Sequence, residues 1–85
     1  MKTTTKITAI LRTADRTRKV EVDIEPEKHI GSLVDAAIRN WRLPAEAHYS
    51  IVNVTRNRTL AFSEIADESI APFDLLELQP VLVAG

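Results

Sequence analysis

Residues 19–41, KVEVDIEPEKHIGSLVDAAIRNW, contain the change of period that decides the fold. In the first six residues, apolar and charged side chains alternate, which is the period of a β-strand with one buried face. From Ile30 onward the apolar side chains recur at steps of three and four, which predicts one stripe of an α-helix. Pro26 separates the two patterns and ends the strand. The stretch therefore predicts a strand followed by a helix that packs on a sheet.

The helix is predicted over residues 32–43, because this segment contains no glycine or proline and Pro44 follows it. Ser32 with Asp35 resembles a capping box, although a residue before Ser32 could be the true cap.

The segment before this stretch predicts a β-hairpin. In residues 6–12, Ile7, Ala9 and Leu11 point to one face and Thr8, Ile10 and Arg12 to the other. Residues 13–18 are polar and read as the turn that leads into the alternation of Val20, Val22 and Ile24.

The second half of the chain predicts three more strands. Residues 49–54 are β-branched and aromatic, which favours a strand, and a polar turn at 55–59 leads to a short strand at 60–62. Residues 63–66 are expected to begin one helical turn capped by Ser63. A turn at 71–74 precedes the last strand, at 75–79, which Pro80 is expected to end.

This order of elements predicts an α+β fold, a mixed four- to five-stranded sheet with one main helix packed on one face. The length of 85 residues fits a single domain at 6–79, with a flexible N-terminus at 1–5 and an extended C-terminal tail at 80–85.

The composition of the chain excludes several classes of function. The chain has no cysteine, which excludes disulfides, thiolate metal sites and cysteine nucleophiles. His29 and His48 lack partners at metal-ligand spacing, and the serines lack a nucleophile motif, so we expect no metal, no cofactor and no enzyme activity. The net charge is −1, which gives no general attraction to nucleic acid. The polar start of the chain and the short apolar runs predict a cytoplasmic protein without membrane insertion.

The order of elements resembles the β-grasp fold of ubiquitin-like proteins over residues 6–79. Local matches are Val20-Glu21-Val22 followed by Pro26 and Ile30, Leu43-Pro44 after the helix, and Pro72-Phe73-Asp74 before Leu75-Leu76-Glu77-Leu78. Within that superfamily the chain looks closest to the bacterial YukD-like branch, on the residues Trp41, Leu43, Pro44, Tyr49, Leu60, Ile70, Asp74, Leu75 and Leu76.

The resemblance implies two alternative functions. Some members of the branch are accessory proteins of type VII secretion systems, which bind partners without covalent attachment. Others occur with E1-like activating enzymes, E2-like proteins and JAB-type peptidases, which implies a protein modifier. A modifier needs a tail that threads an activating enzyme, and Pro80, Val81, Leu82 and Val83 are expected to leave the sheet as such a tail.

The end of the sequence favours the modifier. Gly85 has no Cβ to hinder its carbonyl, so its carboxylate is the expected site of conjugation. Ala84 departs from the familiar Gly-Gly ending, which also makes a third function, sulfur transfer, less favoured.

Ubiquitin-like proteins usually bind partners through an apolar patch on the sheet. Ile10, Val52, Val54 and Leu76 are the candidates here, because some of them lie off the phase of the core. The competing explanation is that register or bulges turn them inward.

Overall fold

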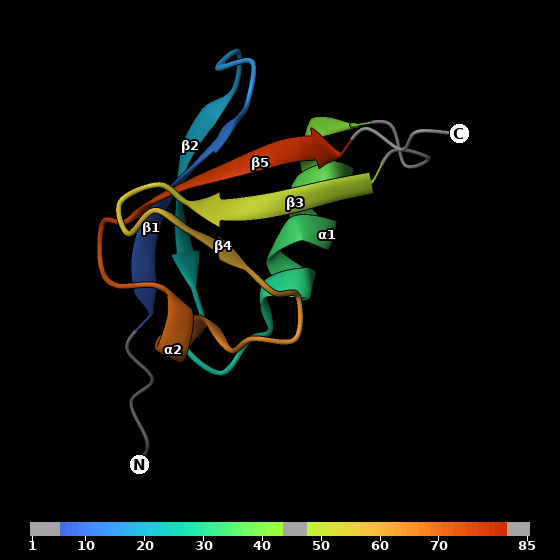
Figure 1. The fold of residues 1–85 in the computed structure, drawn as a ribbon. Helices are drawn as coiled ribbons and strands as arrows, with labels where there is room; N and C mark the ends of the chain where they lie inside the picture. Colours follow the sequence, from blue (N-terminus) through green and yellow to red (C-terminus); the bar gives the residue numbers. More distant parts are fainter. Residues whose placement is uncertain (1–5, 44–47, 82–85) are drawn as a thin grey trace.

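The computed structural model describes residues 6–43 and 48–81 of the chain (Figure 1). The elements of these residues are β1 (Ile7–Thr13), β2 (Lys19–Ile24), α1 (Ile30–Trp41), β3 (His48–Asn53), β4 (Arg58–Leu60), α2 (Ala66–Ser69) and β5 (Leu75–Val81). Neither helix is long and apolar enough to cross a membrane.

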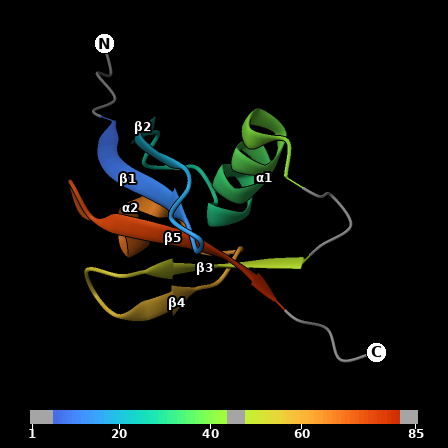
Figure 2. The ribbon, with the colours of Figure 1, turned by 90° about the horizontal axis from the view of Figure 1, so that it is seen from above.

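The strands form one mixed sheet in the order β2-β1-β5-β3-β4. Strand β5 is parallel to β1 and antiparallel to β3, and the two outer pairs are antiparallel. Helix α1 lies across one face of the sheet, as the view from above shows (Figure 2). We call the sheet face toward α1 the inner face and the opposite one the outer face. This architecture confirms the predicted α+β fold, and it places β5 at the centre of the sheet.

The core lies between the inner face and α1. The predicted phase of β1 is confirmed, since Ile7, Ala9 and Leu11 are buried there. The cluster also contains Leu76 and Leu78 of β5, Ile51 of β3, and Ile30, Val34 and Ala37 of α1. Burying one large aliphatic side chain contributes about 1.5–3 kcal/mol, so this cluster is the main source of stability.

Of the two predicted starts of α1, the capping box at Ser32 is wrong and the alternative, a cap residue before Ser32, is confirmed. The helix begins at Ile30, Ser32 lies in its first turn, and His29 holds the cap position with no side-chain cap bond. The segment before α2 supplies the missing acceptors instead: the Ile30 amide donates to the Glu64 carbonyl at 2.9 Å, and the Gly31 amide to the Phe62 carbonyl at 3.0 Å. Because these partners are distant in sequence, no local motif could reveal them.

The C-terminal end of α1 comes two residues earlier than predicted. Arg42 takes a left-handed conformation, with φ of 53°, and ends the helix at Trp41. The Leu43 amide then donates to the Ile38 carbonyl at 3.0 Å, which satisfies one of the last carbonyls of the helix. Pro44 lies outside the described residues.

The boundaries of β3, β4 and α2 also differ from the prediction. The β3–β4 turn covers residues 54–57, where Asn57 has a positive φ of 54°, so β4 begins at Arg58 rather than at residue 60. The short helix α2 begins at Ala66, three residues later than expected, and Ser63 does not cap it.

Proline does not end β5, contrary to the prediction. The strand continues through Pro80, which pairs with Tyr49, to Val81, which pairs with His48. Pairing with β1 stops at Leu78, so beyond it β5 has a neighbour on one side only. A strand open on one side tolerates a residue without an amide hydrogen.

Candidate functional site

The outer face carries an apolar group that crosses three strands. Strand pairing places Ile10 of β1 beside Leu75 of β5. The Val54 amide donates to the Leu75 carbonyl at 2.8 Å, which brings the end of β3 to the same group. Val52 lies one step along β3, opposite Glu77. These four side chains come from distant parts of the sequence and share one surface.

Three of the four predicted surface residues lie on this face and one does not. Ile10 and Val52 are half-buried, and Val54 is 37% exposed. The prediction for Leu76 is wrong, because this side chain is fully buried on the inner face, opposite Leu11. Leu75 takes the outward position instead, so the register of β5 turned one candidate inward.

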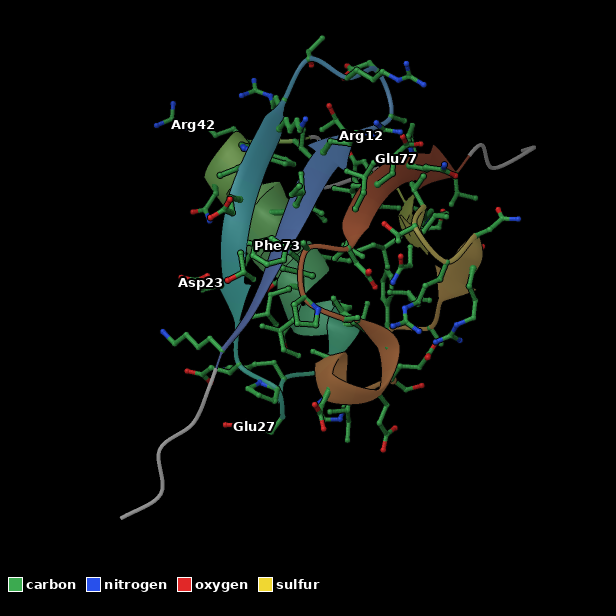
Figure 3. The ribbon with its side chains drawn as sticks, turned by 90° about the vertical axis from the view of Figure 1, so that its left-hand side faces the viewer. Arg12, Asp23, Glu27, Arg42, Phe73 and Glu77 are labelled. Atoms are coloured by element: carbon green, nitrogen blue, oxygen red, sulfur yellow. The ribbon has the colours of Figure 1, made fainter. Side chains whose placement is uncertain are left out.

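An ion pair lies in the middle of the outer face. Arg12 of β1 binds Glu77 of β5 through Nη2 at 2.7 Å and Nε at 2.8 Å, and Gln79 donates to the other oxygen of Glu77 at 2.8 Å. The bond from Gln79 lowers the pKa of Glu77 and burial raises it, and with the added effect of Arg12 the pKa lies below its usual range. The side chains are only 20% and 13% exposed, so the outer face presents a fixed charged centre beside apolar residues (Figure 3).

Phe73 is the functional candidate that sequence reasoning missed. Its side chain is 68% exposed, and its backbone has a positive φ of 67°, which is unfavourable for a bulky residue. Its amide donates to the Thr8 carbonyl at 2.6 Å, and its ring lies on the side of the sheet that carries Arg12 and Glu77 (Figure 3). An exposed aromatic side chain held in a strained conformation points to a binding role. The turn signal at residues 71–74 located the bend but not the direction of this ring.

A buried carboxylate fixes the turn that carries Phe73. Asp74 accepts hydrogen bonds at one oxygen, from the side chain of Asn53 at 2.9 Å, the Ala71 amide at 2.9 Å and Nε of Arg56 at 3.0 Å. Burial raises the pKa of Asp74, but these three bonds outweigh it, so the pKa lies below its usual range. Asn53 is also buried and donates to the Ser69 carbonyl at 3.1 Å. The network joins β3, α2 and the start of β5.

Acids balance the two arginines around the β3–β4 turn. Arg56 binds Asp74, and Arg58 binds Glu64. His29 and His48 begin different elements, and within residues 6–43 and 48–81 no three acidic or histidine side chains gather in a way that could hold a metal ion.

The prediction that Pro80 and Val81 leave the sheet as the start of the tail is wrong, because both lie in β5 and pair with β3. Val81, the last residue of β5, is 46% exposed. The side chain of Pro80 is exposed as well. The expected tail and conjugation residues Leu82, Val83, Ala84 and Gly85 lie outside the described residues.

Comparison with known structures defines the class of fold. The chain has the ubiquitin-like β-grasp fold. It is similar to a ubiquitin of Caldiarchaeum subterraneum, with a TM-score of 0.74 and 17% identity over 94% of this chain and 99% of that one. It is also similar to a de novo protein designed on the basis of ubiquitin, with a TM-score of 0.73 and 23% identity over 94% of this chain and 95% of the design. No model of a protein family matches the sequence, and no curated protein matches it significantly.

Proposed function

We propose that the chain is a bacterial ubiquitin-like modifier that an E1-like enzyme activates at Gly85 in the cytoplasm. The observation that carries this proposal is the course of β5. The central strand of the sheet continues without a break to the exposed residue Val81, and residues 82–85 follow it directly in the sequence. A partner that binds the folded domain therefore fixes the position of Val81, the residue from which the tail continues.

The chemistry takes place at one carboxylate and belongs to the partners. The Gly85 carboxylate attacks the α-phosphate of ATP, and pyrophosphate leaves as an acyl-adenylate forms. A cysteine thiolate of the activating enzyme then displaces AMP and forms a thioester. After transfer to an E2-like protein, an amine or hydroxyl group of the target attacks the thioester and releases the thiol. The chain supplies only the acyl group and a recognition surface.

The outer face is the recognition surface in this proposal. Exposed apolar and aromatic side chains, here Val54 and Phe73, supply contact area, and the fixed Arg12–Glu77 pair supplies orientation through charged hydrogen bonds. E1-like, E2-like and JAB-type partners all have to bind the folded domain before they act on its tail.

The decisive experiment follows adducts in cells of the organism that encodes the chain. A form tagged at its N-terminus is purified under denaturing conditions, and mass spectrometry searches for Gly85 joined to a target with loss of one water. We expect adducts for the wild type and none when Gly85 is deleted. The Ala84→Gly variant is the matched control and should form adducts at least as well, because it reduces steric hindrance. Identical patterns for the wild type and the Gly85 deletion would refute the proposal.

The alternative is a YukD-like binding module of a type VII secretion system. Ala84 favours it, because the sequence departs here from the Gly-Gly ending of the familiar modifiers. Such a module uses its folded surface alone. A chain that ends at Val81 keeps all of β5, so in this case it should bind its secretion partner as well as the full chain does. A modifier shortened in this way would lose all adducts and still fold.

A further inference from the structure

Strand β2 leaves one edge of the sheet unpaired within the described residues. It pairs with β1 only and lies at the margin of the sheet (Figure 3). The Thr13 amide donates to the Arg18 carbonyl at 3.0 Å, so this pair is of the hydrogen-bonded kind. Pairs of the two kinds alternate along an antiparallel ladder, and the backbone groups of Lys19, Glu21 and Asp23 therefore point away from β1. These unpaired N–H and C=O groups can form hydrogen bonds with another strand added at this edge.

The inner side of this edge is incompletely covered. Val20 faces inward opposite Leu11, yet it is 41% exposed, and Val22 is only half-buried. A groove runs between these two valines and α1, lined by Leu33, Ala36 and Trp41. A strand added at β2 would cover the apolar side chains that α1 leaves open.

The outer side of the same edge has unpaired charges of opposite sign. Within the described residues, no hydrogen bond or ion pair involves the side chains of Lys19 and Glu21. Arg12 lies opposite Lys19 but is neutralised by Glu77. An occupant of this edge should therefore offer a negative group opposite Lys19 and a positive group opposite Glu21.

We propose that the occupant is a second copy of this chain, paired antiparallel through β2. In the register that places Val20 opposite Val20 of the second copy, Lys19 faces Glu21 of that copy, and its Lys19 faces Glu21 of the first. The neighbouring register, with Glu21 opposite Glu21, keeps two Lys19–Asp23 pairs but adds a like-charge contact, and the next one sets Glu21 against Asp23 twice. Charge complementarity thus favours a second copy as the partner and the Val20–Val20 register over its neighbours.

Backbone geometry agrees with this register. Lys19 and Glu21 both direct their backbone groups outward, so each Lys19–Glu21 pair can exchange two hydrogen bonds between the copies. The central Val20 pair is then of the non-hydrogen-bonded kind, in which opposite side chains come closest. The interface covers the exposed valine with its own counterpart, and it leaves both outer faces open.

Exchanging the charges of Lys19 and Glu21 tests whether the partner is a second copy of this chain. Analytical ultracentrifugation over a range of concentrations should show that the full chain dimerises. Lys19→Glu and Glu21→Lys should each weaken dimerisation about tenfold, because each creates two like-charge contacts. An equimolar mixture of the two variants should recover it, since every contact in the mixed dimer is again between opposite charges. Glu68→Lys, on the exposed surface of α2, is the matched control and should have no effect.

Disulfide crosslinking tests the register. The chain has no cysteine, so single cysteines report one position each. Under mild oxidation Val20→Cys should give a covalent dimer, whereas Val22→Cys and the exposed β4 variant Thr59→Cys should stay monomeric. The proposal is overturned if the full chain is monomeric at every concentration, if the mixed charge variants stay monomeric, or if Val20→Cys crosslinks no faster than Thr59→Cys. The readouts do not involve Gly85, so they are independent of the proposed conjugation.

Discussion

Replacing Asp74 should destabilise the fold strongly, because its buried carboxylate anchors the turn before β5. The carboxylate is 6% exposed and accepts three hydrogen bonds at one oxygen. Asp74→Ala removes all three at once. Asn53 keeps its bond to the Ser69 carbonyl, and Arg56 is 55% exposed and can turn to water. The Ala71 amide loses its acceptor.

The expected loss follows from these contacts. A hydrogen bond to a charged group contributes about 1.5–3 kcal/mol. The bonds from Asn53 and Ala71 contribute nearly this full amount to the free energy of unfolding, because both donors are largely shielded from water. The bond from the exposed Arg56 adds less than about 1 kcal/mol. With partial relaxation of the turn, Asp74→Ala should lower the free energy of unfolding by about 3 kcal/mol. Asp74→Asn keeps the shape and one acceptor, so about half that loss is expected.

Urea unfolding followed by fluorescence of Trp41, the single tryptophan, measures this change. With a slope of about 1 kcal/mol/M for a small domain, the midpoint should fall by about 3 M. Asp67→Ala, an exposed acid on α2, is the control and should shift the free energy by less than about 0.5 kcal/mol. If Asp74→Ala and Asp67→Ala unfold at the same midpoint, the buried network does not hold the turn and our reasoning is wrong.

Three more predictions concern the strain, the register and the acid stability of the fold. Phe73→Gly should be more stable than Phe73→Ala by about 1 kcal/mol in the same urea assay, because only glycine relieves the positive φ; the opposite order would argue against the strain. Leu76→Ala should lose about 2–5 kcal/mol and Val54→Ala less than about 1, and equal losses would contradict the register of β5. Bonds from Arg58, Ala61 and Ser69 lower the pKa of Glu64 from 4.5 to about 2, so its ionised form stabilises the fold above about pH 4.5 and this contribution is lost as the pH falls toward 2. The Glu64→Gln variant should therefore lose less stability than the wild type across that window of pH, and parallel urea midpoints would speak against the assignment.

The parts of the fold that the sequence predicted are those with a local signal. The periods of β1, β2 and α1 and the turn around Pro72 depend on neighbouring residues, and the structure confirms them. The start of α1 depends on distant carbonyls at Phe62 and Glu64, so the serine at position 32 was misleading.

The contrast between local signals and long-range contacts also explains which residues of the candidate site were predicted correctly. Leu75 and Leu76 are both leucine, so the sequence alone could not tell which one faces inward; pairing with β1, far away in the chain, decides it. Ile10 was found because Ile7, Ala9 and Leu11 alternate and leave it off the phase of the core, and the pairing of β3 then places Val52 on the same face. Phe73 was missed because a turn motif gives the position of a bend but not the sign of φ, which here depends on contacts with Thr8 and the Asp74 network.

The central place of β5 has a consequence for how the protein is made. A ribosome delivers residues 75–81 after the other four strands, and until then the β1–β2 hairpin and the β3–β4 pair have no strand between them. Contacts as far apart in sequence as Arg12 and Glu77 close only when the whole chain is present, which makes folding slow relative to local structure. A chain broken off before β5 therefore lacks the strand that joins the two halves of the sheet, and a partner that recognises the finished sheet selects molecules whose synthesis has passed Val81.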